Sequence, residues 1–174
     1  MYGSRGVILS LKTVKSLSQK ITTLMDRKKL VSVILKTIIE SFRLDKAGIL
    51  TLKGTSNCYQ SEKLLGFKAK DLSLETSNFL IRHLKKKRSL EINEELTLKI
   101  KDAFPGEKAS PLIQLKEEMR KMEAEVCLPL ISKGRLGGLL LLGKKISDRP
   151  YSKQDLELLQ TLANQAALAF ENIR

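Results

Sequence analysis

The sequence predicts a single domain of the α+β (α/β) class. Along the chain, the strands of an antiparallel sheet follow an opening helix and precede a closing helix. Three observations support this prediction. Apolar residues recur with helical spacing near both ends of the chain, and short apolar runs lie between them. Two of these runs, 125–131 and 136–143, are separated by a short turn that contains Gly134, which is the usual signal for a β-hairpin.

The first helix is expected within residues 1–25, which we treat as an N-terminal segment separate from the domain at 26–174. Its apolar residues follow near-heptad spacing, at Val7, Leu11, Val14, Leu17, Ile21 and Leu24. Asp26 is a candidate N-cap for a second helix, because its carboxylate can accept hydrogen bonds from the first free backbone N–H groups. The apolar face of that second helix contains Leu30, Ile34, Ile38 and Phe42.

Turn residues divide the part of the chain that follows. Residues 45–53 are predicted to form the first strand and residues 58–65 the second, with a turn at 54–57 and a Gly66-Phe67 step at the end. The middle of the chain is less regular. There we expect a helix at 74–84, a short strand at 89–92, a polar loop at 99–111 and a helix at 112–122.

The closing hairpin contains two features that each allow more than one interpretation. Pro129 donates no hydrogen bond to a ladder, so its strand is expected to lie at an edge or to contain a bulge. Leu136 to Gly143 shows no alternation, which predicts a strand covered on both faces. Within it, Gly137-Gly138 indicates either a β-bulge or a close approach by a neighbouring backbone or ligand.

The closing helix has a clear start. Ser152 followed by Asp155 is a capping-box-like pair, with the carboxylate at the positive end of the helix dipole. Two apolar stripes follow along the helix, one at Leu156, Leu159, Ala163, Ala166 and Phe170 and one at Leu158, Leu162, Ala169 and Ile173. A surface that wide predicts contact with the sheet and with a second element, for which another copy of the same helix is the obvious candidate.

Composition places the chain among ordinary globular proteins. Its 174 residues are 42% hydrophobic, and neither a membrane-spanning run nor a signal peptide is recognisable. We therefore expect a soluble, cytoplasmic protein, with the cytoplasmic part of a membrane-bound sensor as a further possibility. The two cysteines, Cys58 and Cys127, are too few for a disulfide scaffold and have no metal-ligand spacing, so both are expected to be reduced, with Cys127 buried.

The net charge of +13 arises from residues 1–88. Its densest cluster, Lys85-Lys86-Lys87-Arg88, is compatible with contacts to nucleic acid or to an anionic membrane surface. A solvated helix end explains the same cluster, because basic side chains complement the negative end of the helix dipole. No aromatic residue is interleaved with the cluster, as stacking on bases would require, so nucleic-acid binding is the less favoured interpretation.

The order of elements at 124–174 resembles the closing half of a GAF domain, and the opening helix, the two strands and Gly66-Phe67 extend the resemblance toward the N-terminus. This resemblance implies a central antiparallel sheet of five or six strands, with the N- and C-terminal helices on one face and a ligand-sized cavity on the other. The most similar pattern is that of GAF modules in bacterial sensor histidine kinases. The resemblance therefore implies a small-molecule-binding and signal-relay module within a larger two-component signalling protein.

Motifs of specific GAF activities are incomplete in this chain. Cyclic-nucleotide GAF domains have Asn-Lys, Phe and Asp-Glu, whereas the matching positions here read Gly143-Lys144, Tyr151 and Asp155-Leu156. We predict that Lys144 and Asp155 form a structural pair. The cysteine sets of methionine sulfoxide reductases and of bilin-binding domains are not reproduced, and the single histidine allows no Ser/His/Asp arrangement. The domain itself is expected to have no enzymatic activity and no metal site, and its cofactor is unknown.

The irregular middle is where a GAF domain normally holds a ligand. Side chains that could line such a cavity, each of which is also a plausible core residue, are Tyr59, Phe79, His83, Leu115, Met119, Met122 and Cys127. We further expect a parallel homodimer through the terminal helices, with contacts at Leu11, Val14, Leu17, Leu158, Leu162 and Ala169, and an output domain downstream in the same chain. The alternatives left open are a ligand-free dimerisation module and a basic nucleic-acid-binding domain.

Overall fold

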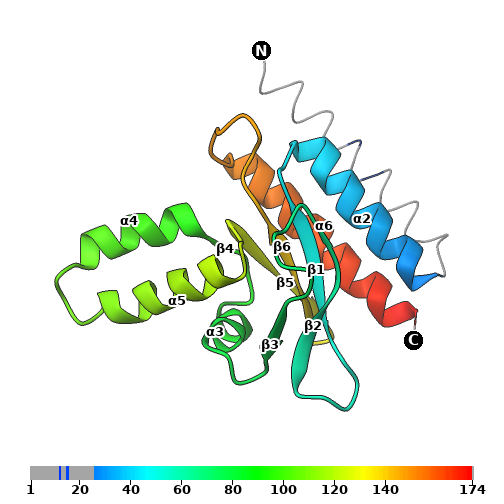
Figure 1. Ribbon diagram of the computed structural model, residues 1–174, viewed down its shortest axis with the longest axis horizontal. Helices are drawn as coiled ribbons and strands as arrows, with labels where there is room; N and C mark the ends of the chain where they lie inside the picture. Colours follow the sequence, from blue (N-terminus) through cyan, green and yellow to red (C-terminus); the bar gives the residue numbers. More distant parts are fainter. Residues whose placement is uncertain (1–11, 13–14, 16–25, 174) are drawn as a thin grey trace.

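A computed structural model of the protein describes residues 12, 15 and 26–173 (Figure 1). The five helices of the described part are α2 (Arg27–Phe42), α3 (Phe79–Lys87), α4 (Asn93–Ala103), α5 (Ala109–Lys121) and α6 (Lys153–Asn172). Its six strands are β1 (Ala47–Leu52), β2 (Cys58–Leu65), β3 (Ser73–Glu75), β4 (Glu91–Ile92), β5 (Val126–Ser132) and β6 (Arg135–Leu142). Among these residues, no helix is both long enough and apolar enough to cross a bilayer.

The strands form one antiparallel sheet in the order β3-β2-β1-β6-β5-β4. Helices α2 and α6 lie side by side on one face, while α3 and α5 cover the other (Figure 1). Helix α4 packs on α5, and together they extend beyond the β4 edge of the sheet. The predicted α+β class, the antiparallel sheet of five or six strands and the placement of the opening and closing helices on one face are confirmed, and the sheet has six strands.

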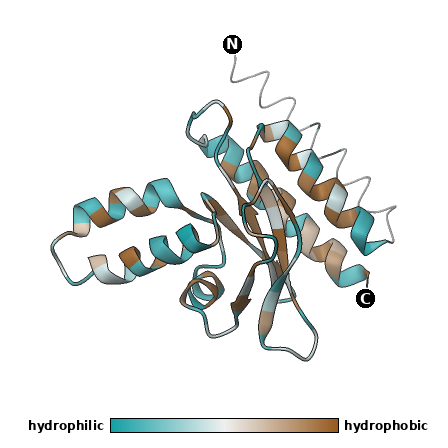
Figure 2. Cartoon of the chain, viewed as in Figure 1, coloured by the Kyte–Doolittle hydropathy of each residue, from teal (hydrophilic) through white to brown (hydrophobic). Residues whose placement is uncertain are grey.

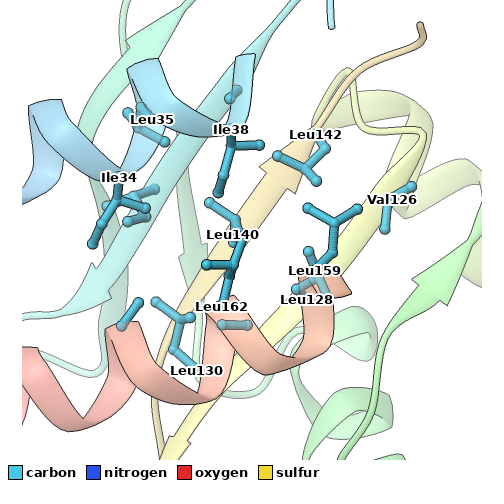
Figure 3. Packing of buried hydrophobic residues seen from close by; sticks show 14 of the residues in the cluster. Ile34, Leu35, Ile38, Val126, Leu128, Leu130, Leu140, Leu142, Leu159 and Leu162 are labelled. Atoms are coloured by element: carbon cyan, nitrogen blue, oxygen red, sulfur yellow. The ribbon is translucent and has the colours of Figure 1, made fainter. Parts of the chain in front are cut away.

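The sheet separates two hydrophobic cores, and its middle strands contribute to both. In β6, Leu140 and Leu142 point toward α2 and α6, whereas Leu139 and Leu141 point toward α3 and α5. Figure 3 shows the first core, in which Ile34 and Ile38 of α2 approach the sheet beside Leu162 of α6. The apolar colouring of β5 and β6 in Figure 2 reflects this two-sided burial. The unalternating run at 136–143 is therefore a strand covered on both faces, as predicted.

Both helix starts read from the sequence are confirmed. The Asp26 carboxylate accepts hydrogen bonds from the backbone N–H groups of Lys28 and Lys29. At the start of α6, Ser152 accepts a bond from the Asp155 N–H while the Asp155 carboxylate accepts one from the Ser152 N–H, which completes a capping box. Each cap satisfies backbone donors that have no partner within the helix.

The β5–β6 hairpin turns through Lys133 and Gly134, whose positive φ angles of 51° and 76° are those of a tight hairpin turn. Both interpretations of Gly137-Gly138 hold. Leu130 pairs with Gly138 and Ile131 with Leu136, which leaves Gly137 as the extra residue of a bulge. A Cβ atom on Gly138 would lie 2.5 Å from the Leu50 carbonyl oxygen, so this glycine permits the close approach of β1.

At Pro129, strand β5 forms the edge of the sheet, as expected for a strand that contains a proline. Strand β4 pairs with β5 only at Glu91–Cys127 and Ile92–Val126, so Pro129 lies beyond the end of β4 and pairs with Leu139 of β6 alone. The missing N–H therefore costs no ladder bond on the outer side of the sheet.

The middle of the chain differs from the sequence-based prediction in three ways. Leu74 lies in strand β3, and helix α3 begins only at Phe79 after the Asn78 cap. Residues 93–103 form helix α4, so its last five residues replace the start of the loop predicted at 99–111. Helix α4 has a single fully buried residue, Leu96, so its sequence lacks the wide apolar stripe that identifies most helices. The predicted helix at 112–122 is confirmed as α5, which starts three residues earlier.

The proposed contacts of the closing helix with a partner need correction. Leu162 and Ala169 are buried in the first core, and Leu158 packs against the same core. Both apolar stripes of α6 are used within one chain, because the helix contacts β5 and β6 as well as α2. Leu162 and Ala169 are therefore not available to a second copy. The other predicted contacts, Leu11, Val14 and Leu17, lie outside the described residues.

Candidate functional site

Five of the seven predicted ligand contacts are buried in the second core. These residues are Tyr59, Leu115, Met119, Met122 and Cys127, and the Tyr59 hydroxyl donates a 2.7 Å hydrogen bond to the Leu136 carbonyl oxygen. Phe79 packs against the edge of the same core. None of the seven lines either of the two cavities described below, so their role in ligand binding stays a prediction.

The remaining candidate, His83, belongs to a polar cluster at the edge of that core. Glu91 of β4 is only 1% exposed, yet it is a carboxylate. Its Oε2 atom lies 2.7 Å from His83 Nε2 and 3.0 Å from Lys87 Nζ, both on α3. Its Oε1 atom is buried and has no hydrogen-bond partner among the described residues. A donor on a small molecule would satisfy that atom, whereas an unpaired buried acceptor costs about 1–3 kcal/mol.

Charge and burial act in opposite directions within this cluster. Burial by itself would raise the pKa of Glu91, but the hydrogen bonds and positive charges of His83 and Lys87 outweigh it and lower the pKa. Cys127 lies directly opposite Glu91 in the sheet. Burial, and to a lesser extent the Glu91 charge, raises the pKa of the Cys127 thiol, so this cysteine stays protonated and unreactive at neutral pH.

Sequence reasoning missed Glu91, although a signal for it existed. Glu91 is an acidic residue in a short apolar strand, four residues after Lys87 and eight after His83. Where a helix is followed closely by a strand that packs beside it, this spacing can bring the three side chains together. Within the described residues there is no group of three or more histidine, cysteine or acidic side chains that could hold a metal ion. The other cysteine, Cys58, is partly buried, and its thiol lies 3.6 Å from the Tyr59 carbonyl oxygen.

The predicted pair between Lys144 and Asp155 is wrong by one residue. Lys145 Nζ contacts Asp155 Oδ2 at 2.5 Å, while the Lys144 backbone N–H donates to Asp45. The Tyr151 hydroxyl donates a 2.6 Å bond to the Gly143 carbonyl oxygen. The loop between β6 and α6 is thus attached to the helix start, as expected, but through the second lysine. Two adjacent lysines cannot be distinguished by sequence spacing alone.

A second polar network lies on the other face of the sheet, where α2 begins. Glu62 of β2 accepts hydrogen bonds from Thr51 Oγ1 at 2.6 Å, Lys53 Nζ at 2.9 Å and Arg27 Nε at 3.0 Å. Burial alone would raise the pKa of Glu62, but these three donors lower it to about 2. The network ties the first turn of α2 to β1 and β2.

This pKa shift predicts a pH dependence of folding. The unfolded carboxyl has a pKa of about 4.3, so the stabilisation by Glu62 is complete above that pH and is lost as the pH falls toward 2. Glu62→Gln is expected to flatten the pH dependence of the melting temperature between about pH 5 and pH 2. Glu40→Gln, a change at an exposed helix position, provides the matched control. Equal slopes for the two variants would contradict the prediction.

Two cavities lie at opposite ends of the domain. The first, of about 440 Å³, is bounded by the β5–β6 hairpin, the start of α2 and the last turns of α6. The second, of about 810 Å³, lies between α5, the start of α4 and the β6–α6 loop. Acidic and basic side chains line the second in equal number, among them the ion pair of Lys46 and Glu123, so it has no net preference for ions of either sign.

The architecture is similar to that of several domains of known structure. The GAF domain of a phosphoenolpyruvate-protein phosphotransferase from Coxiella burnetii aligns with a TM-score of 0.68 at 15% identity, over 95% of each chain. A fragment of a methyl-accepting chemotaxis protein gives 0.67 at 15% identity, over 90% of this chain and 96% of that one. A free methionine-R-sulfoxide reductase from Neisseria meningitidis in complex with its substrate gives 0.67 at 16% identity, over 97% and 92%.

These likenesses define a class by its fold, namely α+β domains that occur in proteins as different as a chemotaxis protein, a phosphotransferase and a reductase. The family-level comparison is more specific, because residues 26–170 match the GAF domain. The chain therefore belongs to the GAF domain family, whose members are generally sensory or regulatory modules. Comparison with curated proteins gives no significant match.

Proposed function

We propose that this domain binds a small molecule and relays that event within a larger signalling protein whose output is a histidine kinase. The observation that supports a relay most directly is the position of the two terminal helices. The Arg27 guanidinium, at the start of α2, lies 5.2 Å from the centroid of the Phe170 ring near the end of α6. The start of α2 and the end of α6 thus lie at the same end of the domain (Figure 1).

Sensing is assigned to the opposite face of the sheet. There the Glu91 cluster joins α3 to β4, and one carboxylate oxygen is left for a donor from a ligand. Strand β6 contacts both cores through alternate side chains, Leu139 and Leu141 on one face and Leu140 on the other. A ligand that moved α3 or α5 would shift β6, and this shift would change the contacts between β6 and α6. A relay needs such contacts to differ between the ligand-free and the ligand-bound state.

The ligand is best identified by a thermal-shift screen of the purified chain against cyclic nucleotides, haem, amino acids and aromatic metabolites. A compound at 100 times its dissociation constant stabilises the folded state by about 2.7 kcal/mol. We expect at least one compound to raise the melting temperature of the wild type and to act less on Glu91→Gln. Glu62→Gln, on the opposite face, is the control. If no compound acts, the alternative of a ligand-free dimerisation module is favoured.

The proposed histidine kinase output is tested with the protein expressed from its complete gene. Incubation with radiolabelled ATP is expected to give an acid-labile, base-stable phosphate bond, which is the behaviour of phosphohistidine. A protein that incorporates no label, or that contains only acid-stable phosphate, would exclude a histidine kinase and leave the sensory assignment to be judged by the ligand screen.

The domain itself is proposed to be non-enzymatic. The reductase that shares this fold is the specific reason to consider catalysis. Cys127, however, is fully buried with a raised thiol pKa, and Cys58 is partly buried at the start of β2. Neither has the electropositive, accessible surroundings that activate a thiolate. The basic cluster at the end of α3 also has a structural use, since Lys87 pairs with Glu91, which weakens the case for nucleic-acid binding.

A homodimer remains part of the proposal, with the contacts redistributed. Because Leu162 and Ala169 are in the core, the partner contacts of α6 are limited to its outer surface, where Leu168 is 56% exposed. The main contribution is then assigned to the first helix, through Leu11, Val14 and Leu17.

A further inference from the structure

The cavity of about 440 Å³ at the end of α2 and α6 contains groups that none of the preceding roles uses. It is lined on one side by the β5–β6 hairpin, including Ser132, Arg135 and the bulge residue Gly137. On the other side it is lined by Arg27 and by Phe170 of α6. Its volume lies within the usual range of about 300–1,000 Å³ for small-molecule sites.

Two polar side chains on the hairpin have no partner among the described residues. Arg135 is exposed, and none of the ion pairs in the described part of the chain involves it. The Ser132 hydroxyl is buried without a hydrogen bond. Rotation about one side-chain torsion would let this hydroxyl meet an acceptor, and a guanidinium fork binds carboxylates with two parallel hydrogen bonds.

The charge balance of the cavity favours a singly charged anion. Arg27 is already engaged by Glu62, whose other cationic partner is Lys53. Glu171 also lines the cavity and opposes a second negative charge. Arg27 and Lys53 balance the charges of Glu62 and Glu171, so Arg135 leaves one net positive charge. A dianionic phosphate would meet the repulsion of Glu171 without a second free guanidinium, whereas a carboxylate needs only one.

The walls add an apolar and aromatic surface. Phe170 is held in place by Arg27, which lies 5.2 Å above its ring, and the remaining lining is mostly apolar, with Leu52, Leu130, Leu136 and Ala167. We propose that this cavity binds a small organic carboxylate with an aromatic or aliphatic body, with Arg135 as the residue that binds the carboxylate. This site lies on the face of the sheet opposite the Glu91 cluster and goes beyond the function proposed above.

Its position gives such a ligand a direct effect on the terminal helices. A molecule in the cavity contacts the first residue of α2 and the last turns of α6 at the same time. It would therefore bias the relative position of the two helices without acting through the sheet.

The test is a titration of the ¹⁵N-labelled chain with 2-naphthoate, followed by the backbone amide signals of Gly54 and Gly137, which both line the cavity. Saturable shifts at both glycines are expected. Arg135→Gln is expected to weaken binding by at least about tenfold, the effect of losing a charge-assisted hydrogen bond. Lys133→Gln, an exposed basic residue of the same hairpin outside the lining, is the matched control and should bind as the wild type does.

Two further probes separate the chemistry of the site. The neutral analogue 2-naphthamide should bind at least about tenfold more weakly than 2-naphthoate, and inorganic phosphate should produce no saturable shift at the two glycines. Equal binding of the amide, or equal weakening by Lys133→Gln and Arg135→Gln, would overturn the carboxylate assignment. Shifts confined to residues around Glu91 would also overturn it, while leaving the sensory function of the opposite face intact.

Discussion

Leu162→Ala is expected to lower the free energy of unfolding by about 2–5 kcal/mol, the range found when a buried leucine is truncated in a well-packed core. Leu162 is 1% exposed and extends from α6 into the first core beside Leu140 (Figure 3). The loss combines the transfer of apolar surface with the cavity left behind, since neighbouring side chains relax only in part. Urea denaturation followed by circular dichroism measures it.

Leu168→Ala, on the outer surface of the same helix, is the matched control. Its side chain is 56% exposed, so the change is expected to alter the stability of the monomer by no more than about 0.5 kcal/mol. Similar losses in the two variants would mean that α6 does not bury the face assigned to it here.

The same burial decides how the homodimer is tested. Changing Leu158 and Leu162 together to glutamate would place a charge in the first core and unfold the chain, so it cannot report on association. Leu11→Glu combined with Leu17→Glu removes apolar surface only from the N-terminal segment. A wild type that sediments as a dimer and a variant that sediments as a folded monomer would support the proposed interface. A variant that stays a dimer would exclude the N-terminal segment as that interface.

Elements with local signals could be predicted from the sequence, and those that depend on tertiary contacts could not. The Asp26 cap and the Ser152–Asp155 capping box are chemical interactions within four residues, so spacing alone identifies them. Helix α4 is stabilised by packing on α5 through few apolar side chains, and strand β3 is three residues long. Neither has a period long enough to be recognised in one sequence.

In the candidate site, too, some residues could be identified from the sequence and others depended on tertiary contacts. His83 and Cys127 were identified as side chains that could line a cavity, and the structure places both beside Glu91. Glu91 itself was missed because its importance comes from burial, which depends on the whole sheet. The apolar candidates Met119 and Leu115 were expected at a cavity but lie in close-packed core, since side chains that could line a cavity are the same types that fill one.

Removing both cations from the Glu91 cluster, by His83→Ala with Lys87→Ala, is expected to cost about 3–5 kcal/mol, as when a buried charge is left without its partners. The sign of the pH dependence should also reverse. In the wild type the pKa of Glu91 is lowered, so its stabilisation is present above the unfolded pKa and is lost as the pH falls. Without the cations, burial raises that pKa, so stability is highest in acid and falls as the pH rises through the new value.

An apolar replacement of the whole cluster separates stability from function. Glu91→Leu with His83→Leu and Lys87→Met is expected to be neutral or to stabilise the fold by about 1–4 kcal/mol, because three charged or polar groups no longer need to be desolvated. The same variant should lose the ligand-induced rise in melting temperature. A large loss of stability in this variant would show that the cluster is a structural requirement. Retained stability together with a lost ligand response would mean that Glu91 is kept buried, with one oxygen unpaired, for what it binds.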